Sequence, residues 1–294
     1  MDERLEAHLE RAALDDEAFV ERAYRLVLLR PPDDAGRLAA VRRLGDGTLS
    51  RSALLVELME SDEHAQTRAL DDGVAFARWA RAARERPREL TAPPRADSRA
   101  IEIPWVLARY RGEQRVLDVG YAFAEPAWIA ALLELDAPAL VAVDLAERDV
   151  PGLRTVTADV RSLPFDAGAF DVALCVSTLE HVGADPSVYG HDAEQERDGM
   201  ARALRELHRV LARGGRALLT LPIGEPSHRG WYVQLDLEGW RELFGAAGFA
   251  VFEEETYDLG DAGWRAAPPR SARLFCVELR PQRVADRLWR RLGR

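Results

Sequence analysis

Residues 115–126 constrain the fold of this chain more than any other segment. An apolar run ends in Asp118, Gly120 opens a loop in which small and larger residues alternate, and Pro126 begins an apolar helical pattern. Glycine permits the backbone angles of a tight turn, and proline suits the first position of a helix. The segment therefore predicts a strand, a turn and a helix, the corner at which parallel α/β folds bind ligands beyond the carboxyl ends of their strands.

Acidic residues follow further apolar runs, at the places where strands are expected to end. Asp144 closes the second run and Asp159 follows the third, while the fourth leads into Glu180 and His181. Because parallel strands present their carboxyl ends at one edge of a sheet, these side chains are expected to meet there. The three strands are predicted at residues 140–144, 154–158 and 170–176.

In the order and spacing of these features, residues 100–280 resemble the class I S-adenosylmethionine-dependent methyltransferases. The resemblance implies an α/β fold, a Rossmann-like seven-stranded methyltransferase sandwich, with S-adenosyl-L-methionine as the cofactor. It also implies that the closing strands, residues 249–257 and 272–279, form an antiparallel hairpin at the edge of the sheet, joined by an irregular loop.

A nicotinamide dehydrogenase is the competing interpretation of the loop, because both classes place glycines after the first strand. Dinucleotide folds rest the pyrophosphate on the N-terminus of the following helix. This chain has Glu125 there, and a carboxylate would repel the phosphates and occupy the positive end of the helix itself. S-adenosylmethionine carries no phosphate, so the loop favours the methyltransferase.

Ala122 and Ala124 stand where methyltransferases usually carry glycine. Alanine narrows the allowed backbone angles and adds a methyl group at each position. Two interpretations remain open: a methyltransferase that tolerates the alanines, or a noncatalytic scaffold with a degenerate cofactor loop. The loop is similar to that of bacterial methyltransferases linked to surface polysaccharides, which implies O-methylation of a sugar in such a polysaccharide or its precursor. A small aromatic or lipid acceptor is the further alternative.

The strand-end acids are the best candidates for holding the cofactor. Asp144 can accept both ribose hydroxyls. Asp159 can accept the adenine amino group, with Val160 supplying a backbone N–H and an apolar contact, and Asp118 either orients the loop or meets the cofactor's ammonium group. The cofactor-binding residues are predicted to be Asp118, Gly120, Tyr121, Ala122, Asp144, Leu145, Asp159, Val160 and Ser177.

Glu180 and His181 are the predicted catalytic residues, because they follow the fourth strand, where a methyl acceptor would approach the cofactor. A hydroxyl acceptor must lose its proton, and histidine is the natural base near neutral pH. The alternative is that His181 only caps a helix or braces the loop. Relatives in which this pair binds a metal have another acid three residues earlier, where this chain has Ser177. No metal is therefore expected, and His191 and Asp192 are the alternative ligands that keep a metal site open.

Two polar segments flank the predicted catalytic pair and combine aromatic with hydrogen-bonding side chains. Aromatic faces stack on sugar rings while polar groups bind the hydroxyls, and an aromatic acceptor would be served nearly as well. Structural loops are the alternative. The predicted acceptor-binding residues are Tyr189, His191, His228, Trp231, Tyr232 and Gln234.

Residues 1–86 carry apolar positions at helical spacing and are predicted to be all-α, with Ser50 capping the third helix. Residues 15–65 resemble a small helical bacterial domain related to phycobilisome linkers, which is found attached to enzymes of glycan assembly. That resemblance implies an interaction or scaffold domain with a protein partner. A helical cap on the methyltransferase is the alternative.

The rest of the chain supplies boundaries and exclusions. The proline-rich residues 87–99 are the expected linker, residues 100–280 the methyltransferase domain, and residues 281–294 a basic amphipathic tail that either touches an anionic membrane or forms a solvated helix. A net charge of −10 disfavours nucleic-acid binding. The start has no apolar signal region, and Cys175 and Cys276 lie in apolar strands, so we expect a cytoplasmic protein with both thiols in the core.

Overall fold

A computed structural model of the chain describes residues 14–190 and 195–282. His191, Asp192 and all but the first two residues of the predicted tail therefore lie outside the described residues. The chain divides into two compact units. We call the described part of Met1–Asp72 with Arg95–Asp97 the N-terminal unit, and Gly73–Pro94 with the described part of Ser98–Arg294 the C-terminal unit. The boundary between these units does not coincide with the predicted linker at residues 87–99. The predicted boundaries of the helical and methyltransferase domains stay a prediction.

The N-terminal unit is helical because each helix has its own cap and an apolar face. The Asp15, Asp33 and Ser50 side chains accept the backbone N–H three residues on, at 2.8, 2.7 and 3.1 Å. The cap at Ser50 was predicted and is confirmed. Phe19, Val20, Leu54, Leu55 and Leu58 form the core of the unit. Its helices are α2 (Asp16–Val27), α3 (Asp34–Gly45), α4 (Arg51–Met59) and the first half of α5 (Asp62–Ala83).

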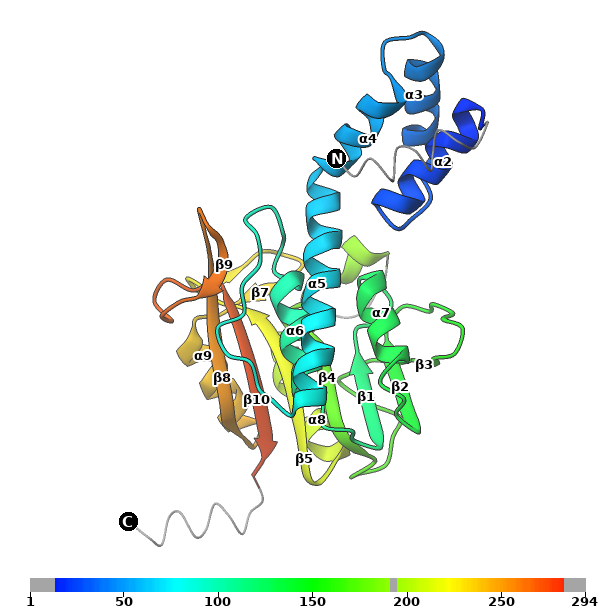
Figure 1. Cartoon of the computed structure of the whole chain (residues 1–294). Helices are drawn as coiled ribbons and strands as arrows, with labels where there is room; N and C mark the ends of the chain where they lie inside the picture. The colour runs from blue at the N-terminus through cyan, green and yellow to red at the C-terminus, as the bar shows by residue number, and fades with distance from the viewer. Residues whose placement is uncertain (1–13, 191–194, 283–294) are drawn as a thin grey trace, which may run out of the picture. The chain divides into compact units, whose positions relative to one another are not determined.

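The C-terminal unit is built on one sheet of eight strands in the order β3-β2-β1-β4-β5-β10-β8-β9 (Figure 1). Strands β3, β2, β1, β4 and β5 are parallel, whereas β10 runs antiparallel to both β5 and β8. The strands are β1 (Arg115–Val119), β2 (Ala139–Asp144), β3 (Arg154–Thr157), β4 (Phe170–Val176), β5 (Leu211–Pro222), β8 (Phe249–Gly260), β9 (Gly263–Ala266) and β10 (Leu274–Pro281).

The eighth strand is the one departure from the predicted seven-stranded sheet. Residues 263–266, predicted as part of an irregular loop, form β9 and pair antiparallel with β8. Gly263 has a left-handed φ of 99°, which lets the chain reverse directly after β8, and Trp264 is buried. The predicted antiparallel arrangement of the two closing strands is confirmed as β8 and β10.

Helices cover both faces of the sheet. In Figure 1, α6 (Arg99–Arg109) and α7 (Pro126–Leu133) lie in front of the strands, and α8 (Gly199–Val210) and α9 (Leu237–Ala246) lie behind them. Leu204, Leu207, Trp240 and Phe244 of the rear pair are buried against the sheet, in one core with Cys175. Cys175 and Cys276 are free and buried, as expected. Within the described residues, no helix has both the length and the apolarity needed to cross a membrane.

The register of the central strands brings three loops to one edge of the sheet. Asp118 of β1 lies opposite Ala142 of β2 and Leu174 of β4, and all three strands run in the same direction. The loops that follow them therefore leave the sheet side by side. Together with the loop after β3, which contains Asp159 and Val160, they contain most of the residues predicted for the cofactor and for catalysis.

Candidate cofactor and acceptor site

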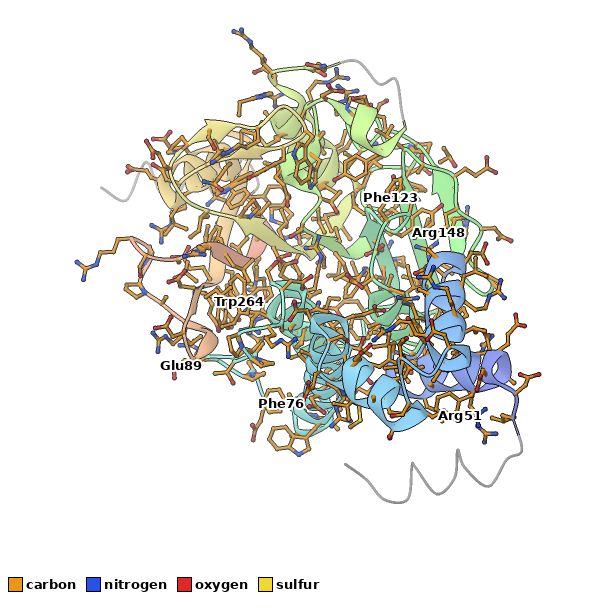
Figure 2. The ribbon with its side chains drawn as sticks, turned by 90° about the horizontal axis from the view of Figure 1, so that it is seen from above. Arg51, Phe76, Glu89, Phe123, Arg148 and Trp264 are labelled. Carbon is orange, nitrogen blue, oxygen red and sulfur yellow. The ribbon has the colours of Figure 1, made fainter. Side chains whose placement is uncertain are left out.

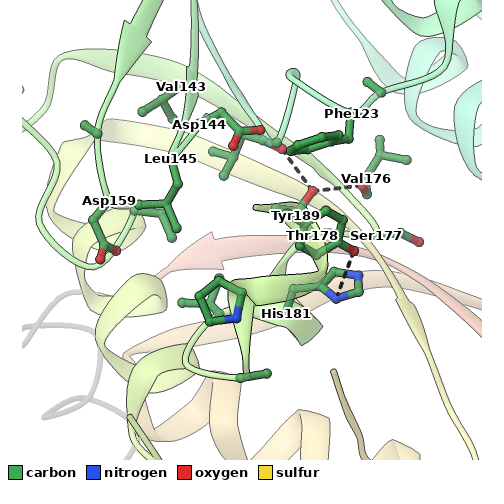
Figure 3. A pocket seen from close by; sticks show the side chains of 18 of the residues that line it. Phe123, Val143, Asp144, Leu145, Asp159, Val176, Ser177, Thr178, His181 and Tyr189 are labelled. Carbon is green, nitrogen blue, oxygen red and sulfur yellow. Dashed lines mark hydrogen bonds between the residues drawn. The ribbon is translucent and has the colours of Figure 1, made fainter. Parts of the chain in front are cut away.

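A cavity of about 240 Å³ lies at this edge, beyond β1, β2 and β4 (Figure 3). Its walls come from these three loops and the loop after β3, together with α6, α7 and the short helix η2 (Pro186–Tyr189). Six of the residues predicted for the cofactor line it, namely Gly120, Asp144, Leu145, Asp159, Val160 and Ser177. Asp118, Tyr121 and Ala122 are not among the described residues that line it.

Position 120 requires glycine, both because of its backbone angles and because Thr178 leaves no room for a side chain. Its φ is 96°, and a Cβ atom added there would lie 2.1 Å from the Oγ1 atom of Thr178. The Thr178 hydroxyl lies 3.2 Å from the carbonyl oxygen of Val119 and 3.0 Å from that of Val176 (Figure 3). The ends of β1 and β4 therefore approach each other closely at the cavity wall.

Asp144 holds the loop and still has capacity for a ligand. One carboxylate oxygen accepts the backbone N–H of Ala122 at 3.0 Å, and the other accepts that of Ala146 at 3.0 Å. A carboxylate offers about four lone-pair sites. Each oxygen can therefore accept one further hydrogen bond, as two ribose hydroxyls would require.

The alanines of the loop need no glycine-like backbone. Among the described non-glycine residues, a left-handed φ occurs only at Leu29, Arg84, Glu89, Asp136 and Ser177. Ala122 and Ala124 therefore adopt ordinary backbone angles, and the first of them has its N–H bound by Asp144. The conformational objection to a methyltransferase with these alanines is removed.

Asp159 is held by an arginine that the sequence patterns did not single out. Arg161 donates from Nη2 at 2.6 Å and from Nε at 2.9 Å, and it lines the cavity itself. Burial alone would raise the pKa of Asp159, but the hydrogen bonds and charge of Arg161 outweigh it and lower that pKa. The carboxylate therefore stays ionised and oriented at the cavity wall.

Asp118 lies beneath the cavity rather than in it. Its Oδ1 atom accepts the indole N–H of Trp128 at 3.0 Å, while its Oδ2 atom has no hydrogen-bond partner among the described residues. Burial raises its pKa to about 7, with the charge of Asp144 adding to the shift and the Trp128 hydrogen bond opposing it. Because Trp128 lines the cavity, this arrangement favours the orienting role of Asp118 over direct contact with the cofactor.

His181 presents one nitrogen as a base. Its Nδ1 atom lies 2.9 Å from the carbonyl oxygen of Trp231. A carbonyl can only accept, so Nδ1 carries the proton and Nε2 keeps its lone pair. Burial lowers the pKa of His181, the hydrogen bond to Trp231 opposes this, and the charge of Arg99 lowers it further. The ring is therefore neutral at neutral pH and able to accept a proton at Nε2.

Glu180 is buried beside His181 and holds a proton of its own. Burial raises its pKa to about 8, and the nearby Glu102 carboxylate adds to this shift. Its Oε1 atom lies 3.8 Å from His181 Nε2, too far for a hydrogen bond. Glu102 is also buried and accepts the Ser177 hydroxyl at 2.9 Å. Two carboxyl groups therefore lie behind the cavity wall, and Glu180 is protonated at neutral pH.

The protonation of Glu180 predicts how stability changes with pH. Between pH 4.5 and about 8 the folded protein keeps a proton that the unfolded chain has lost, so raising the pH through this window lowers the free energy of unfolding. We expect Glu180→Gln to make this decline less steep, leaving the contribution of Asp118, whose pKa is raised to about 7. Melting temperatures from pH 5 to 8 test this, with exposed Glu147→Gln as control. Parallel curves for Glu180→Gln and wild type would contradict it.

Aromatic rings surround His181 and continue to the rim of the cavity. The rings of His181 and Trp231 stack with centroids 5.1 Å apart and planes inclined by 17°. Tyr189 lies between His181, at 5.6 Å, and Phe123, at 5.0 Å. Tyr232 contacts both Trp231 and His181. Phe123 is 60% exposed and was not predicted, although it lies inside the loop that the sequence singled out.

The remaining acceptor candidates lie on the hairpin of β6 (Ser227–His228) and β7 (Val233–Gln234). His228 Nδ1 accepts the N–H of Gly230 at 3.2 Å, and the Gln234 amide donates to the carbonyl of Glu225 at 3.0 Å. Both side chains brace the hairpin. Of the predicted acceptor-binding residues that the structure describes, Tyr189 lines the cavity, whereas Trp231, Tyr232, His228 and Gln234 do not. No cluster of three or more metal-ligating side chains occurs within residues 14–190 and 195–282.

The fold and the cavity are those expected of an S-adenosylmethionine-dependent methyltransferase. The residues present fit the cofactor: Gly120 lets the backbone approach it closely, and Asp144 and Asp159 offer acceptors beside the apolar Leu145 and Val160. Glu125 lines the cavity directly before α7, where a pyrophosphate would otherwise rest.

Comparison with known proteins adds a family match for each unit. Residues 120–219 match the model of a methyltransferase domain, and residues 6–68 match a domain of unknown function (DUF4214). The predicted relation of the N-terminal helices to phycobilisome linkers stays a prediction. The sequence matches no curated protein.

Two solved structures illustrate the structural likeness. One is 1,6-didemethyltoxoflavin-N1-methyltransferase from Burkholderia thailandensis, with bound 1,6-didemethyltoxoflavin and S-adenosylhomocysteine; it is 18% identical, with a TM-score of 0.44 over 86% of this chain and 93% of that one. The other is an S-adenosylmethionine-dependent methyltransferase from Mesorhizobium loti, 17% identical, with a TM-score of 0.44 over 64% of this chain and 99% of that one.

Proposed function

We propose that the protein O-methylates a sugar hydroxyl of a bacterial surface polysaccharide or of its precursor. The observation that carries this proposal is the hydrogen bond from His181 Nδ1 to the Trp231 carbonyl, which leaves Nε2 as the basic nitrogen of a residue that lines the cavity. A hydroxyl acceptor needs such a base. Tyr189, Trp231 and Tyr232 surround it with ring faces of the kind that stack on sugars.

Each residue has a separate task in this scheme. The cofactor supplies an electrophilic methyl group on a sulfonium sulfur. Tyr189 and Trp231 position the acceptor ring so that one hydroxyl faces His181 Nε2, which accepts the hydroxyl proton. The Trp231 carbonyl stabilises the resulting imidazolium through Nδ1–H. Alignment of the two reactants, rather than covalent chemistry by the protein, contributes most of the rate.

Release of S-adenosylhomocysteine, measured with a panel of acceptors, tests the proposal. The panel contains a methyl glycoside, a nucleotide-linked sugar and a simple phenol, each at the same concentration. We expect turnover with at least one sugar and little with the phenol. Turnover with the phenol alone would replace the sugar by an aromatic acceptor. Binding of S-adenosylhomocysteine without turnover on any acceptor would favour the scaffold.

An aromatic acceptor is the second candidate, because the exposed Phe123 ring packs on Tyr189 and the exposed Trp231 ring stacks on His181. Planar rings could stack there as well as sugars. We further propose that the helical residues 1–86 bind a protein partner in the cytoplasm, without a role for nucleic acid, and that the basic tail gives at most peripheral membrane contact.

A further inference from the structure

The loop after β1 is fixed by hydrogen bonds with the side chains of Asp144 and Arg148. Within residues 120–124 only Gly120 has a left-handed φ, and the two alanines provide no special backbone geometry. A loop that shapes a binding site loses affinity when it samples several conformations, because ordering it costs free energy on binding. Contacts that fix the loop before the ligand arrives therefore contribute to affinity.

Arg148 and Tyr121 form a reciprocal contact that fixes this loop to the one after β2. The guanidinium Nη1 of Arg148 donates to the carbonyl of Ala122 at 3.0 Å and lies 3.5 Å from that of Tyr121. The Tyr121 hydroxyl donates to the carbonyl of Arg148 at 3.0 Å and lies 3.4 Å from its N–H. Figure 2 labels Arg148 close to Phe123, the residue after Ala122 in the same loop.

Ala122 is consequently held at both of its backbone polar groups. Asp144, the last residue of β2, accepts its N–H, and Arg148, in the loop that follows β2, donates to its C=O. A hydrogen bond from a charged donor is among the stronger ones in proteins. Arg148 itself is not among the described residues lining the cavity, so it acts through Ala122.

We propose that Arg148 is a positioning residue for the cofactor, which preorganises the loop carrying Ala122 by binding its carbonyl group. The role concerns the cofactor only and does not depend on the identity of the acceptor. It goes beyond the proposed function, and its test needs no acceptor for its main readout.

Calorimetric titration with S-adenosylhomocysteine tests this role in the full-length protein. We expect Arg148→Ala to bind about tenfold or more weakly, the effect of losing one charge-assisted hydrogen bond. Arg148→Lys should recover part of the affinity, because a single point charge can reach one carbonyl. Glu147→Ala, an exposed neighbour in the same loop, is the matched control and should bind as wild type does.

Two further measurements separate positioning from general stability. Amide hydrogen exchange in residues 120–124 should become faster in Arg148→Ala, while the melting temperature of the ligand-free variant stays close to that of wild type. With an active acceptor, the KM for S-adenosylmethionine should rise with little change in kcat. Wild-type affinity in Arg148→Ala would overturn the proposal. A loss of affinity matched by a large fall in the ligand-free melting temperature would also overturn it.

Discussion

Gly120→Ala is expected to weaken binding of S-adenosylhomocysteine by about a hundredfold or more, equivalent to ~3 kcal/mol. The alanine methyl would lie 2.1 Å from Thr178 Oγ1 and 2.7 Å from its Cγ2, so the ends of β1 and β4 must separate. The φ of 96° adds backbone strain for any residue with a side chain. Because this position lines the cavity, the displacement falls on the binding site. Calorimetry on the variant measures the loss.

Gly112 provides the matched control, since its φ of 81° is also left-handed but a Cβ atom there meets nothing within 4 Å. Gly112→Ala should cost stability of about 1 kcal/mol from strain alone and leave the affinity unchanged. Thr178→Gly combined with Gly120→Ala should recover part of the affinity by removing the steric contact. Unchanged binding in Gly120→Ala would show that the loop does not contact the cofactor.

His181→Gln is expected to slow turnover by about a hundredfold or more while leaving the affinity for S-adenosylhomocysteine nearly unchanged. The glutamine can still donate to the Trp231 carbonyl but offers no basic nitrogen where Nε2 stands. His208→Gln on α8 is the control, because this histidine packs against Phe249 and is not among the described residues lining the cavity. Initial rates of S-adenosylhomocysteine release, with an acceptor that supports turnover, measure the effect.

The dependence of the turnover rate on pH distinguishes a catalytic base at His181 from a residue that only supports the loop. Because burial lowers the pKa of His181, the basic form should persist to lower pH than for an ordinary histidine, and the rate should begin to fall at a correspondingly lower pH. His181→Gln should lose this acidic limb. Normal turnover in the variant would mean that alignment suffices without a base. A loss of cofactor binding would instead mean that His181 braces the loop.

The sequence predicted the central strands and much of the cavity because both depend on local patterns. Apolar runs ending in Asp118 and Asp144 specify strands and their ends, and parallel pairing then brings the ends together. Arg148 and Arg161 were not predicted, because periodicity does not reveal which side chain in one loop reaches the backbone or carboxylate of another. The sequence pattern also could not predict that Glu180 is protonated, because its raised pKa depends on burial and on the charge of Glu102, which lies on α6.

The strand β9 was not predicted from the sequence, for a different reason. It is four residues long, and its pairing with β8 follows a turn that Gly263 makes possible. Short edge strands carry little alternation of their own, so their existence depends on the neighbouring strand.

The edge strand β9 is also contacted on the side that does not pair with β8. The backbone of Ala92 exchanges two hydrogen bonds with Trp264, at 2.8 and 3.2 Å, and a Cβ atom on Gly263 would lie 2.1 Å from the Ala92 carbonyl. Pro93 and Pro94 follow, and proline cannot donate to a further strand. Part of the segment predicted as a linker therefore covers the edge strand β9 of the sheet. A truncated protein that begins at residue 100 would expose the backbone N–H and C=O groups of this edge strand. Exposed edge strands can pair with another copy of the chain, so the truncated protein should self-associate.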